Sequence, residues 1–364
     1  MIKVLHVVKA LEKNGVTSVI LTYSHNIDRT NFQLDVLTGD LYEEQYREQL
    51  ETDGCRFFVI RNRDKSILSY INSLKQVIKT GQYDVVHVHG NSAMIFPELM
   101  AAKLANVKVR IAHSHNTMCN HPKLEKVVRP IFDHLYTHGI ACSIDAGRWM
   151  FKDRKFTVMN NGIAMDDRKY SESDRQSTRD ELHVNDEEIL IGHVGFFNYQ
   201  KNHTRLISIF EKICKEQTAK LLLVGDGPDR KMIEDMVYEK NLSDKVIFYG
   251  QSTNVARLMS AMDVFVLPSN FEGMPVVILE AQASGMKCIT SANVPEAASA
   301  AIVCLRLDED DDLWEKCIIQ GAKENLGVRY DKSDEYRSFL EYNKYGAHSV
   351  VDELEKYYVE GVNS

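Results

Sequence analysis

The stretch LPSNFEGMPVVILEA, residues 267–281, is the most informative part of the chain, because it joins a strand to a helix through a short turn. The apolar, β-branched run Val264–Leu267 predicts a strand that is buried on both faces. Pro275 suits the first turn of a helix, where the missing N–H would have had no partner. Strands that lead into helices in this way build parallel sheets with helices on both sides.

The same alternation of short apolar runs and longer amphipathic segments covers most of the chain. Because parallel strands need a helical crossover, the alternation predicts right-handed βαβ units in a doubly wound sheet. The predicted strands are Val4–Val8, Leu34–Thr38, Arg56–Ile60, Val85–His89, Val109–His113, Ile140–Ser143, Thr157–Asn160, Ile189–Val194, Lys220–Val224, Val246–Tyr249, Val264–Leu267, Lys287–Thr290 and Ala301–Leu305. The predicted helices include Val16–Ile27, Ser66–Lys79, Phe96–Ala105 and residues 203–217, 229–240, 252–261 and 275–285.

The alternation stops at a polar segment and then restarts. Residues 166–186 are rich in Asp, Arg, Ser and Glu, which predicts a linker with a short helix. We therefore predict two Rossmann-like domains facing a cleft, residues 1–165 and residues 187–345. The last segment, residues 346–364, has helical periodicity and either crosses back to the first domain or caps the second.

The composition is that of a globular protein, with 44% hydrophobic and 26% charged residues in a chain of 364. No segment reaches the ~18–20 apolar residues that a membrane-spanning helix needs, and the first residues lack the pattern of a signal peptide. The seven cysteines are odd in number and show no CxxC spacing. These features predict reduced thiols in a cytoplasmic protein.

Charge is unevenly distributed along the chain. Residues 1–160 carry 21 Lys and Arg and 16 Asp and Glu, whereas the remaining residues carry 23 and 36. A basic first half beside an acidic second half suggests separate surfaces for separate partners, although chance explains such a difference about as well. Lys123, Lys126 and Arg129 have helical spacing and form a candidate basic face; an ordinary solvated helix face is the alternative.

Two glutamates bracket the helix start in residues 267–281, with Glu272 before the helix and Glu280 within it. The first amides of a helix lack intrahelical partners and bind phosphate well. Carboxylates instead accept charge-assisted hydrogen bonds from sugar hydroxyls. The combination predicts a ligand with a diphosphate in the middle and hydroxylated rings on both sides.

The spacing of these glutamates resembles the E-x7-E signature of the retaining glycosyltransferases of family four, which have the GT-B fold. Residues 195–202, GFFNYQKN, are similar to the phosphate loop of that family, and residues 221–228, LLLVGDGP, are similar to its L-x-L-V-G-x-G-P strand-turn. Residues 160–163, NNGI, resemble its linker turn. Residues 111–117, IAHSHNT, resemble the bacterial capsule and exopolysaccharide subgroup.

The resemblance implies a role for each matching residue. Glu272 would hold hydroxyls of the donor sugar, Glu280 would hold the ribose hydroxyls, and Lys201 would stabilise the charge of the departing diphosphate. The implied donor-binding residues are Gly15, Gly195, Asn198, Lys201, Gly227, Glu272, Gly273, Met274, Pro275, Val276 and Glu280. Asn202 is expected to cap the helix that follows the phosphate loop.

Two positions depart from the pattern of the family. Phe196 stands where the family usually has an arginine, so one phosphate-facing cation is missing. Either Lys201 and the helix amides suffice, or another basic residue supplies the charge. Ala164 stands where the linker turn often has an aspartate.

Two histidine pairs lie at strand ends, His87 with His89 and His113 with His115. Alternation places both members of a pair on one face of the strand. A metal site would need a converging carboxylate, which nothing in the sequence requires, and for His87 and His89 we expect hydrogen-bonded burial. The resemblance implies a histidine beside the reacting sugar, for which we choose His115, with His113 as the alternative.

The expected site therefore has a catalytic and an acceptor-binding part. The expected catalytic residues are His115, Lys201 and Glu272, and the expected acceptor-binding residues are His113, Asn116 and Lys123. No metal is expected, because Lys201 and helix amides would supply the positive charge. The acidic run Asp308–Asp312 contains a D-x-D pattern, but five acids in succession are more typical of a solvated loop.

The function that these observations predict is a metal-independent, retaining glycosyltransferase of the hexosyltransferase type. Its donor would be a nucleoside-diphosphate sugar, with uridine as the commoner base, and its acceptor a growing lipid-linked oligosaccharide in capsule or exopolysaccharide synthesis. No cofactor and no nucleic acid partner are expected, and such an acceptor implies peripheral contact with the inner face of the cytoplasmic membrane. Two other functions stay open, a nucleotide-sugar 2-epimerase of the same fold and a non-catalytic partner subunit of a glycosyltransferase.

Overall fold

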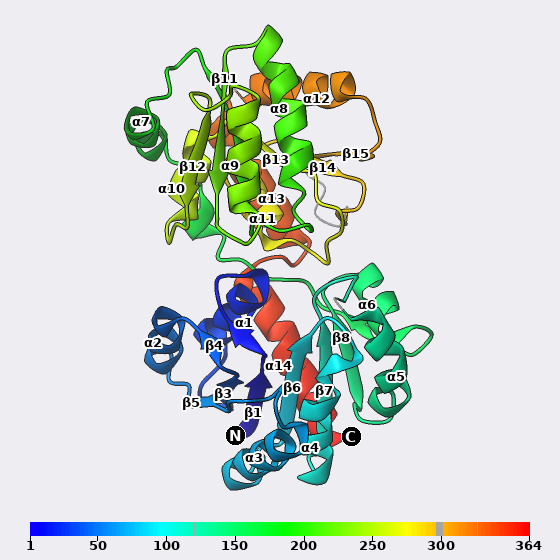
Figure 1. The fold of residues 1–364 in the computed structure, drawn as a ribbon. Helices are drawn as coiled ribbons and strands as arrows, with labels where there is room; N and C mark the ends of the chain where they lie inside the picture. The colour runs from blue at the N-terminus through cyan, green and yellow to red at the C-terminus, as the bar shows by residue number, and fades with distance from the viewer. Residues whose placement is uncertain (120, 296–300, 326) are drawn as a thin grey trace. The chain divides into compact units, whose positions relative to one another are not determined.

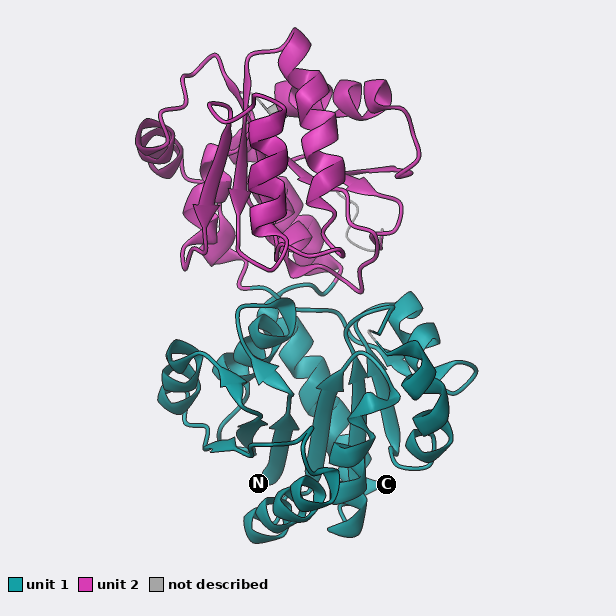
Figure 2. Ribbon diagram, in the orientation of Figure 1, with its two compact units in different colours: residues 1–163, 344–364 teal, residues 164–343 magenta. Residues whose placement is uncertain are grey.

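The computed structural model describes residues 1–119, 121–295, 301–325 and 327–364. The chain forms two compact units (Figure 2): unit 1 comprises residues 1–163 and 344–364, and unit 2 comprises residues 164–343. Each unit is built on a parallel sheet with helices packed against it (Figure 1). The prediction of two Rossmann-like α/β domains is confirmed.

Unit 1 has a seven-stranded sheet in the order β5–β3–β1–β6–β7–β8–β9, so the topological switch point lies between β1 and β6. Its strands are β1 (Ile2–Val7), β3 (Phe32–Thr38), β5 (Phe57–Val59), β6 (Val85–Gly90), β7 (Val109–Ser114), β8 (His138–Ala141) and β9 (Thr157–Val158), and a small second sheet pairs β2 (Ala10–Leu11) with β4 (Leu41–Tyr42). Its helices are α1 (Gly15–Asn26), α2 (Glu44–Thr52), α3 (Ile67–Gly81), η1 (Ala93–Ile95), α4 (Phe96–Leu104), α5 (Pro122–Phe132), α6 (Ile144–Phe151) and α14 (Ala347–Asn363).

Unit 2 has a six-stranded sheet in the order β12–β11–β10–β13–β14–β15, with the switch point between β10 and β13. Ligands of such sheets bind beyond the carboxyl ends of the strands at this point. The strands are β10 (Ile189–Val194), β11 (Ala219–Val224), β12 (Val246–Gly250), β13 (Val264–Leu267), β14 (Cys288–Ser291) and β15 (Ile302–Leu305). The helices are η2 (Asp166–Arg168), α7 (Glu172–Glu181), α8 (His203–Glu216), α9 (Arg230–Glu239), α10 (Val255–Ala261), α11 (Val276–Ala283), α12 (Asp311–Asn325) and α13 (Arg329–Tyr342).

The strands of unit 2 are apolar because helices cover both faces of the sheet. Leu221 and Leu223 of β11 pack into one core cluster, together with residues of α8 and α12. Leu222 and Val224 pack into a second cluster, with residues of α10 and α11. Successive side chains of a strand point to opposite faces, so a continuous apolar run is required here.

The segment predicted as a linker, residues 166–186, lies within unit 2. Its residue Arg179 is buried and bonds to the carboxylate of Asp263 at 3.1 Å and to main-chain carbonyl groups of Asn185 and Glu188. Helix α14 lies within unit 1, so the chain returns to its first unit after it has completed the second (Figure 2).

Candidate active site

The loops that follow β10 and β11 pack backbone against backbone. Gly195 donates its N–H to the carbonyl oxygen of Val224 at 2.9 Å. A side chain on Gly225, at φ +139°, would place its Cβ 2.0 Å from the carbonyl oxygen of Gly195, and one on Gly227, at φ +157°, would place it 2.5 Å from that of Phe197. Only glycine fits both positions. Gly227, a predicted donor-binding residue, is therefore required for the close approach of the two loops, whatever contact it makes with a ligand.

Lys201 and Glu272 meet at the switch point of unit 2. The Lys201 ammonium lies 2.6 Å from Oε1 of Glu272. The same carboxylate accepts hydrogen bonds from Nε2 of Gln200 and from Oγ of Ser269, each at 2.8 Å. Only 14% of the Lys201 side chain and 5% of the Glu272 side chain are exposed. The pair therefore neutralises two largely buried charges just before α11.

Helix α11 begins one residue later than the sequence analysis predicts. Pro275 is the N-cap, and its ψ of 114° is extended rather than helical. Val276 is thus the first helical residue, and its N–H begins the set that lacks intrahelical acceptors. Gly273 and Met274 lie in the buried turn that leads to this end. The turn brings the predicted phosphate-binding amides next to the Lys201–Glu272 pair.

Glu280 lies on the second turn of α11 and pairs with a residue that the sequence analysis missed. Nε of Arg168 donates to Oε1 of Glu280 at 2.8 Å, with 30% of the arginine side chain and 15% of the glutamate side chain exposed. Arg168 belongs to η2, in the segment that its composition predicts to be a linker. Since no motif marks Arg168, only the folded structure reveals this second cation of the candidate site.

Two asparagines shape the predicted phosphate loop, residues 195–202. Asn198 accepts the N–H of Lys201 at its side-chain oxygen, at 3.2 Å. Asn202 precedes α8 at φ 54°, and no side-chain cap is formed. Its amide group donates instead to the carbonyl oxygen of Pro268 at 3.1 Å, which ties the loop after β10 to the loop after β13. Asn202 is the N-cap residue of α8, as predicted, but its side chain bridges the two loops and does not bond to the first amides of the helix.

Two buried histidines that no motif marks, His193 and His203, flank the loop of residues 195–202. Nδ1 of His193 donates to the carbonyl oxygen of Val266 at 2.8 Å. The ring of His203 stacks on Phe197 with centroids 4.0 Å apart. Burial lowers the pKa of His193 to about 4 and that of His203 to about 2, so both are neutral at pH 7. They add no positive charge to the site.

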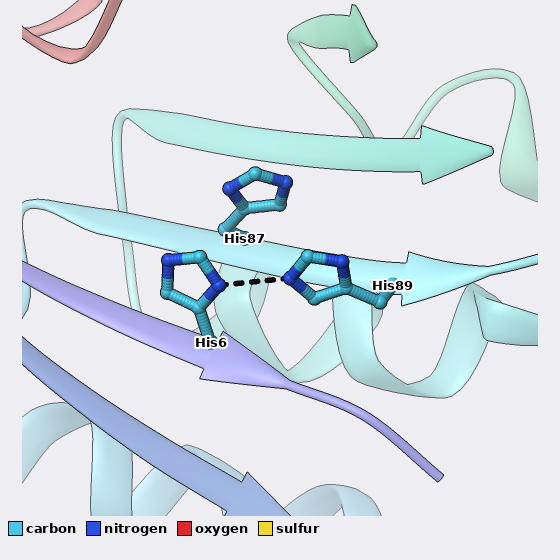
Figure 3. A group of neighbouring side chains, drawn as sticks. All are labelled: His6, His87 and His89. Carbon is cyan, nitrogen blue, oxygen red and sulfur yellow. Dashed lines mark hydrogen bonds between the residues drawn. The ribbon is translucent and has the colours of Figure 1, made fainter. Parts of the chain in front are cut away.

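Five histidines of unit 1 form a connected group with Tyr358 of α14, at the switch point between β1 and β6. Figure 3 shows three of them, which come from β1 and β6. The contacts are His115 Nε2 to His89 Nδ1 (2.9 Å), His89 Nε2 to His6 Nδ1 (2.8 Å), His6 Nε2 to Tyr358 Oη (3.0 Å), Tyr358 Oη to His87 Nδ1 (2.7 Å) and His87 Nε2 to His113 Nδ1 (3.0 Å). The expected hydrogen-bonded burial of His87 and His89 is confirmed.

These histidines are uncharged. Burial lowers the pKa of His6 and of His115 to about 3, and it lowers the pKa values of the other three far below their usual range. Neighbouring imidazoles oppose protonation further at His87, His89 and His113. At pH 7 each ring therefore carries one N–H and one bare nitrogen.

The remaining predicted residues of unit 1 lie in turns and on the surface. Gly15 is the first residue of α1, which Asn14 caps by accepting the N–H of Thr17 at 3.0 Å. The side-chain oxygen of Asn116 accepts the N–H of Thr117 at 2.8 Å, just after β7. Lys123 is exposed on α5. Asn116 therefore lies directly after His115 in the loop that follows β7, whereas Lys123 lies on a separate helix, α5.

Helix α5 presents a face that is both basic and apolar. Its exposed side chains include Lys123, Leu124, Lys126, Val127 and Ile131, of which Val127 is 71% exposed. The prediction that Arg129 belongs to this face is wrong. Arg129 turns inward to the buried carboxylate of Glu125 and to the carbonyl oxygen of Met150, because a buried carboxylate needs a partner. None of the helices in the described ranges has the length and apolar character needed to cross a membrane.

The acidic run near the D-x-D pattern lies in the turn before α12. Asp308 is 78% exposed, and the guanidinium of Arg306 pairs with it at 3.4 Å and with Glu309 at 3.0 Å. Asp311 and Asp312 belong to the first turn of α12, where negative charge is favourable. The run therefore has a structural explanation as a solvated turn and helix start.

Comparison with known proteins assigns a family to both units. The model described as Glycosyltransferase Family 4 matches residues 13–167, and the model described as Glycosyl transferases group 1 matches residues 174–302. The putative glycosyltransferase EpsF of Bacillus subtilis (strain 168) is 31% identical over 338 residues, which cover 88% of each chain. Both family models and this relative are described as glycosyltransferases.

Two further comparisons extend the similarity. An Escherichia coli protein named UDP-Gal:alpha-D-GlcNAc-diphosphoundecaprenol alpha-1,3-galactosyltransferase is 25% identical over 317 residues, covering 80% of this chain and 79% of that one. The crystal structure of Anabaena Alr3699/HepE in complex with UDP-glucose has a TM-score of 0.81 at 16% identity, and covers 99% of this chain and 100% of that one. The predicted GT-B fold is confirmed. The chain belongs to the family 4 glycosyltransferases.

Proposed function

We propose that the chain is a retaining, metal-independent glycosyltransferase that moves a sugar from a UDP-sugar to a lipid-linked oligosaccharide in exopolysaccharide synthesis. The observation that carries the proposal is the Lys201–Glu272 pair at the start of α11, with Glu280 on the same helix. Similarity to EpsF, to a relative named for UDP-Gal and a diphosphoundecaprenol-linked sugar, and to HepE, which was crystallised with UDP-glucose, supports the donor and acceptor classes.

The donor would bind by an exchange of partners. A diphosphate at the start of α11 competes with Glu272 for the Lys201 ammonium, because both anions favour the same cation. The carboxylate that loses its ammonium partner is then available to hydroxyls of the donor sugar. Glu280, which pairs with Arg168 at 2.8 Å, offers the same chemistry to the ribose. The Lys201–Glu272 and Arg168–Glu280 pairs thus neutralise the two carboxylates without the donor, and each carboxylate can exchange its cation for hydroxyl groups of the donor.

The proposed transfer step uses these contacts. The bond between the anomeric carbon and the diphosphate oxygen breaks, and the acceptor oxygen forms its bond to the same face of that carbon. The acceptor proton passes to the departing diphosphate oxygen, so no further base is required. Lys201 and the first amides of α11 stabilise the negative charge that develops there. His115 would hydrogen-bond the reacting sugar.

The acceptor class gives a reason for the exposed face of α5. Apolar side chains at Leu124, Val127 and Ile131 would enter the interfacial region of a bilayer, while Lys123 and Lys126 meet anionic headgroups. The expected contact is peripheral, at the cytoplasmic face. Flotation with vesicles that contain anionic lipid tests it: Val127→Glu should reduce binding, whereas Leu68→Glu, at a 77% exposed position on α3, should not. Equal loss in both variants would remove α5 from the proposal.

The transferase proposal is tested by incubating the protein with UDP-glucose, UDP-galactose or UDP-GlcNAc and a diphospholipid-linked sugar in EDTA. We expect one donor to be consumed and a product whose new linkage keeps the anomeric configuration of the donor, as judged by NMR. An inverted product refutes retention, and loss of activity in EDTA that Mg²⁺ restores refutes metal independence. Epimerised donor without acceptor supports an epimerase, and a chain that binds no nucleotide in calorimetry supports a partner subunit.

A further inference from the structure

The five histidines and Tyr358 form a single unbranched series of hydrogen bonds, which we call the histidine chain. Its order is His115, His89, His6, Tyr358, His87 and His113. The three interior histidines use both ring nitrogens, and Figure 3 shows the link between two of them. The two end histidines use one nitrogen each. Among the residues that the structure describes, Nδ1 of His115 and Nε2 of His113 are therefore the free ends.

Proton counting leaves two arrangements of the histidine chain. A neutral imidazole has one N–H and one bare nitrogen, so each interior ring donates at one nitrogen and accepts at the other. The Tyr358 hydroxyl likewise donates to one neighbour and accepts from the other. Reversal of one link therefore forces the reversal of all five. Either His115 donates to His89 and the free Nε2 of His113 carries a proton, or His89 donates to His115 and that Nε2 is bare.

The buried end of the histidine chain, Nε2 of His113, selects the arrangement in which His89 donates to His115. Nε2 of His113 is buried and has no hydrogen-bond partner in the described part of the chain. A buried N–H without an acceptor is rare in folded proteins. His193 gives an example of the tolerated alternative, because its Nδ1–H donates to Val266 and its buried Nε2, also without a partner, must be bare. By the same reasoning, each histidine of the chain carries its proton on Nδ1.

We propose that His115 presents an N–H donor at Nδ1, and that His89 is the positioning residue that imposes this tautomer by donating to Nε2. The consequence for catalysis rests on the proposed function, which places His115 beside the sugar. A neutral ring with its outward nitrogen protonated donates a hydrogen bond to a sugar oxygen and does not take the acceptor proton. This agrees with a transfer step in which the departing diphosphate takes that proton.

A metal ion is the competing explanation of the same cluster. Ligand atoms of His6, His87 and His89 lie within 4.8 Å of one another, as do those of His89, His113 and His115. All six nitrogens of the first trio already take part in the histidine chain. An ion there would break several of these links and would place a charge among fully buried neutral rings. The hydrogen-bonded arrangement therefore accounts for the geometry at a lower free-energy cost than a bound metal ion would.

The tautomer is measured by NMR of the full chain labelled with ¹⁵N-histidine, with the His115 signals assigned by their loss in His115→Asn. We expect His115 and His89 to show a protonated Nδ1 and a bare Nε2 at pH 7.5. In His89→Phe, the His115 signals should shift toward a mixture of tautomers, because Nε2 loses its partner. A bare Nδ1 on His115 in the wild type, or ¹⁵N shifts that change on addition of one equivalent of Zn²⁺, overturns the inference.

Activity then tests the donor role separately. His115→Asn keeps an N–H donor near the position of Nδ1, whereas His115→Ala removes it, so the asparagine variant should retain at least about tenfold more kcat than the alanine variant. Equal loss in both variants overturns the donor role, since an amide cannot act as a base. If His115→Ala is fully active while the tautomer is as expected, the proposed place of His115 fails and the tautomer assignment stands.

Discussion

Glu272→Gln separates two effects that a carboxylate at this position has on the donor. In the structure the Lys201 ammonium is 2.6 Å from Oε1 of Glu272, and both side chains are largely buried. A diphosphate has to draw the ammonium away from this carboxylate. A charge-assisted hydrogen bond contributes about 1.5–3 kcal/mol, and the lower part of that range applies because Lys201 keeps 14% exposure to water. Removal of the negative charge should therefore strengthen UDP binding by up to about tenfold.

The same substitution should slow transfer. Glutamine keeps the shape and still accepts a hydrogen bond from Gln200 or Ser269, but it no longer accepts charge-assisted bonds from sugar hydroxyls. Loss of one preorganised contact to the transition state costs on the order of 10²–10³ in kcat. Calorimetry with UDP and initial rates at saturating donor measure the two effects independently. Lys201→Met is the matched variant, for which UDP affinity and rate should both fall.

One specific result would refute the exchange of partners at Lys201. If Glu272→Gln weakens UDP binding as much as Lys201→Met does, the carboxylate does not compete with the diphosphate, and the partner exchange is wrong. Ser269→Ala controls for the local packing, since it removes one 2.8 Å hydrogen bond from the carboxylate and leaves the ion pair in place. Its UDP affinity should stay within about threefold of wild type.

Three further predictions concern stability and the second ion pair. Tyr358→Phe leaves two buried ring nitrogens without partners and should lower the free energy of unfolding by about 1–3 kcal/mol in urea denaturation. Tyr357→Phe should cost less, because the Tyr357 hydroxyl, which bonds to the Gly139 carbonyl group at 3.4 Å and to Thr157, belongs to a half-buried side chain. Burial lowers the pKa of His6 to about 3, so between about pH 6.5 and 3 the unfolded chain binds a proton that the folded chain does not bind. The contribution to stability is fully present above about pH 6.5 and should fall, as the pH drops, by up to about 1.4 kcal/mol per pH unit for each such histidine. Urea denaturation at pH 7.5 and at pH 5.5 should therefore give a lower midpoint at pH 5.5. Arg168→Ala frees Glu280 for the ribose and removes a cation that would also attract the diphosphate, so uridine should bind up to about fivefold tighter while UDP gains nothing. Equal gains for both ligands in calorimetry would show that Arg168 does not contribute to diphosphate binding.

The strands could be predicted from the sequence because a helix-covered parallel sheet requires apolar residues on both faces. Val264–Leu267 and Ile189–Val194 have the bounds that the sequence analysis predicts. The first residue of a helix is harder to predict than the bounds of a buried strand, because it depends on a single backbone dihedral angle. Pro275 suits a first helical position by its fixed φ, yet its ψ of 114° makes it the N-cap. The residues of the candidate loops were therefore predicted more reliably than the position at which the helix begins.

The partners of the candidate residues could not be predicted, because they come from segments distant in sequence. Arg168 lies 112 residues before Glu280, in a segment whose composition is typical of a linker. The histidine chain needs Tyr358, which reaches His6 across 352 residues only because α14 belongs to unit 1. The strand-end spacing of the histidines indicated that they share a face, but not that one hydroxyl group connects them.

Phe196→Arg tests whether the missing cation of the phosphate loop matters. The Phe196 side chain is 51% exposed, and the loop is held by main-chain contacts such as the 2.9 Å bond from the Phe197 N–H to the Asp226 carbonyl oxygen, so the substitution should not disturb the fold. An added guanidinium beside a bound diphosphate should contribute about 0.5–1 kcal/mol at an exposed site, or a two- to fivefold gain in UDP affinity that shrinks at high salt. Tyr199→Arg adds the same charge to the same loop at a 72% exposed position and should gain less. Equal gains would show only the effect of net charge. No gain in Phe196→Arg would mean that Lys201 and the helix amides, or a cation such as Arg168, already saturate the diphosphate, and that the phenylalanine costs the protein nothing.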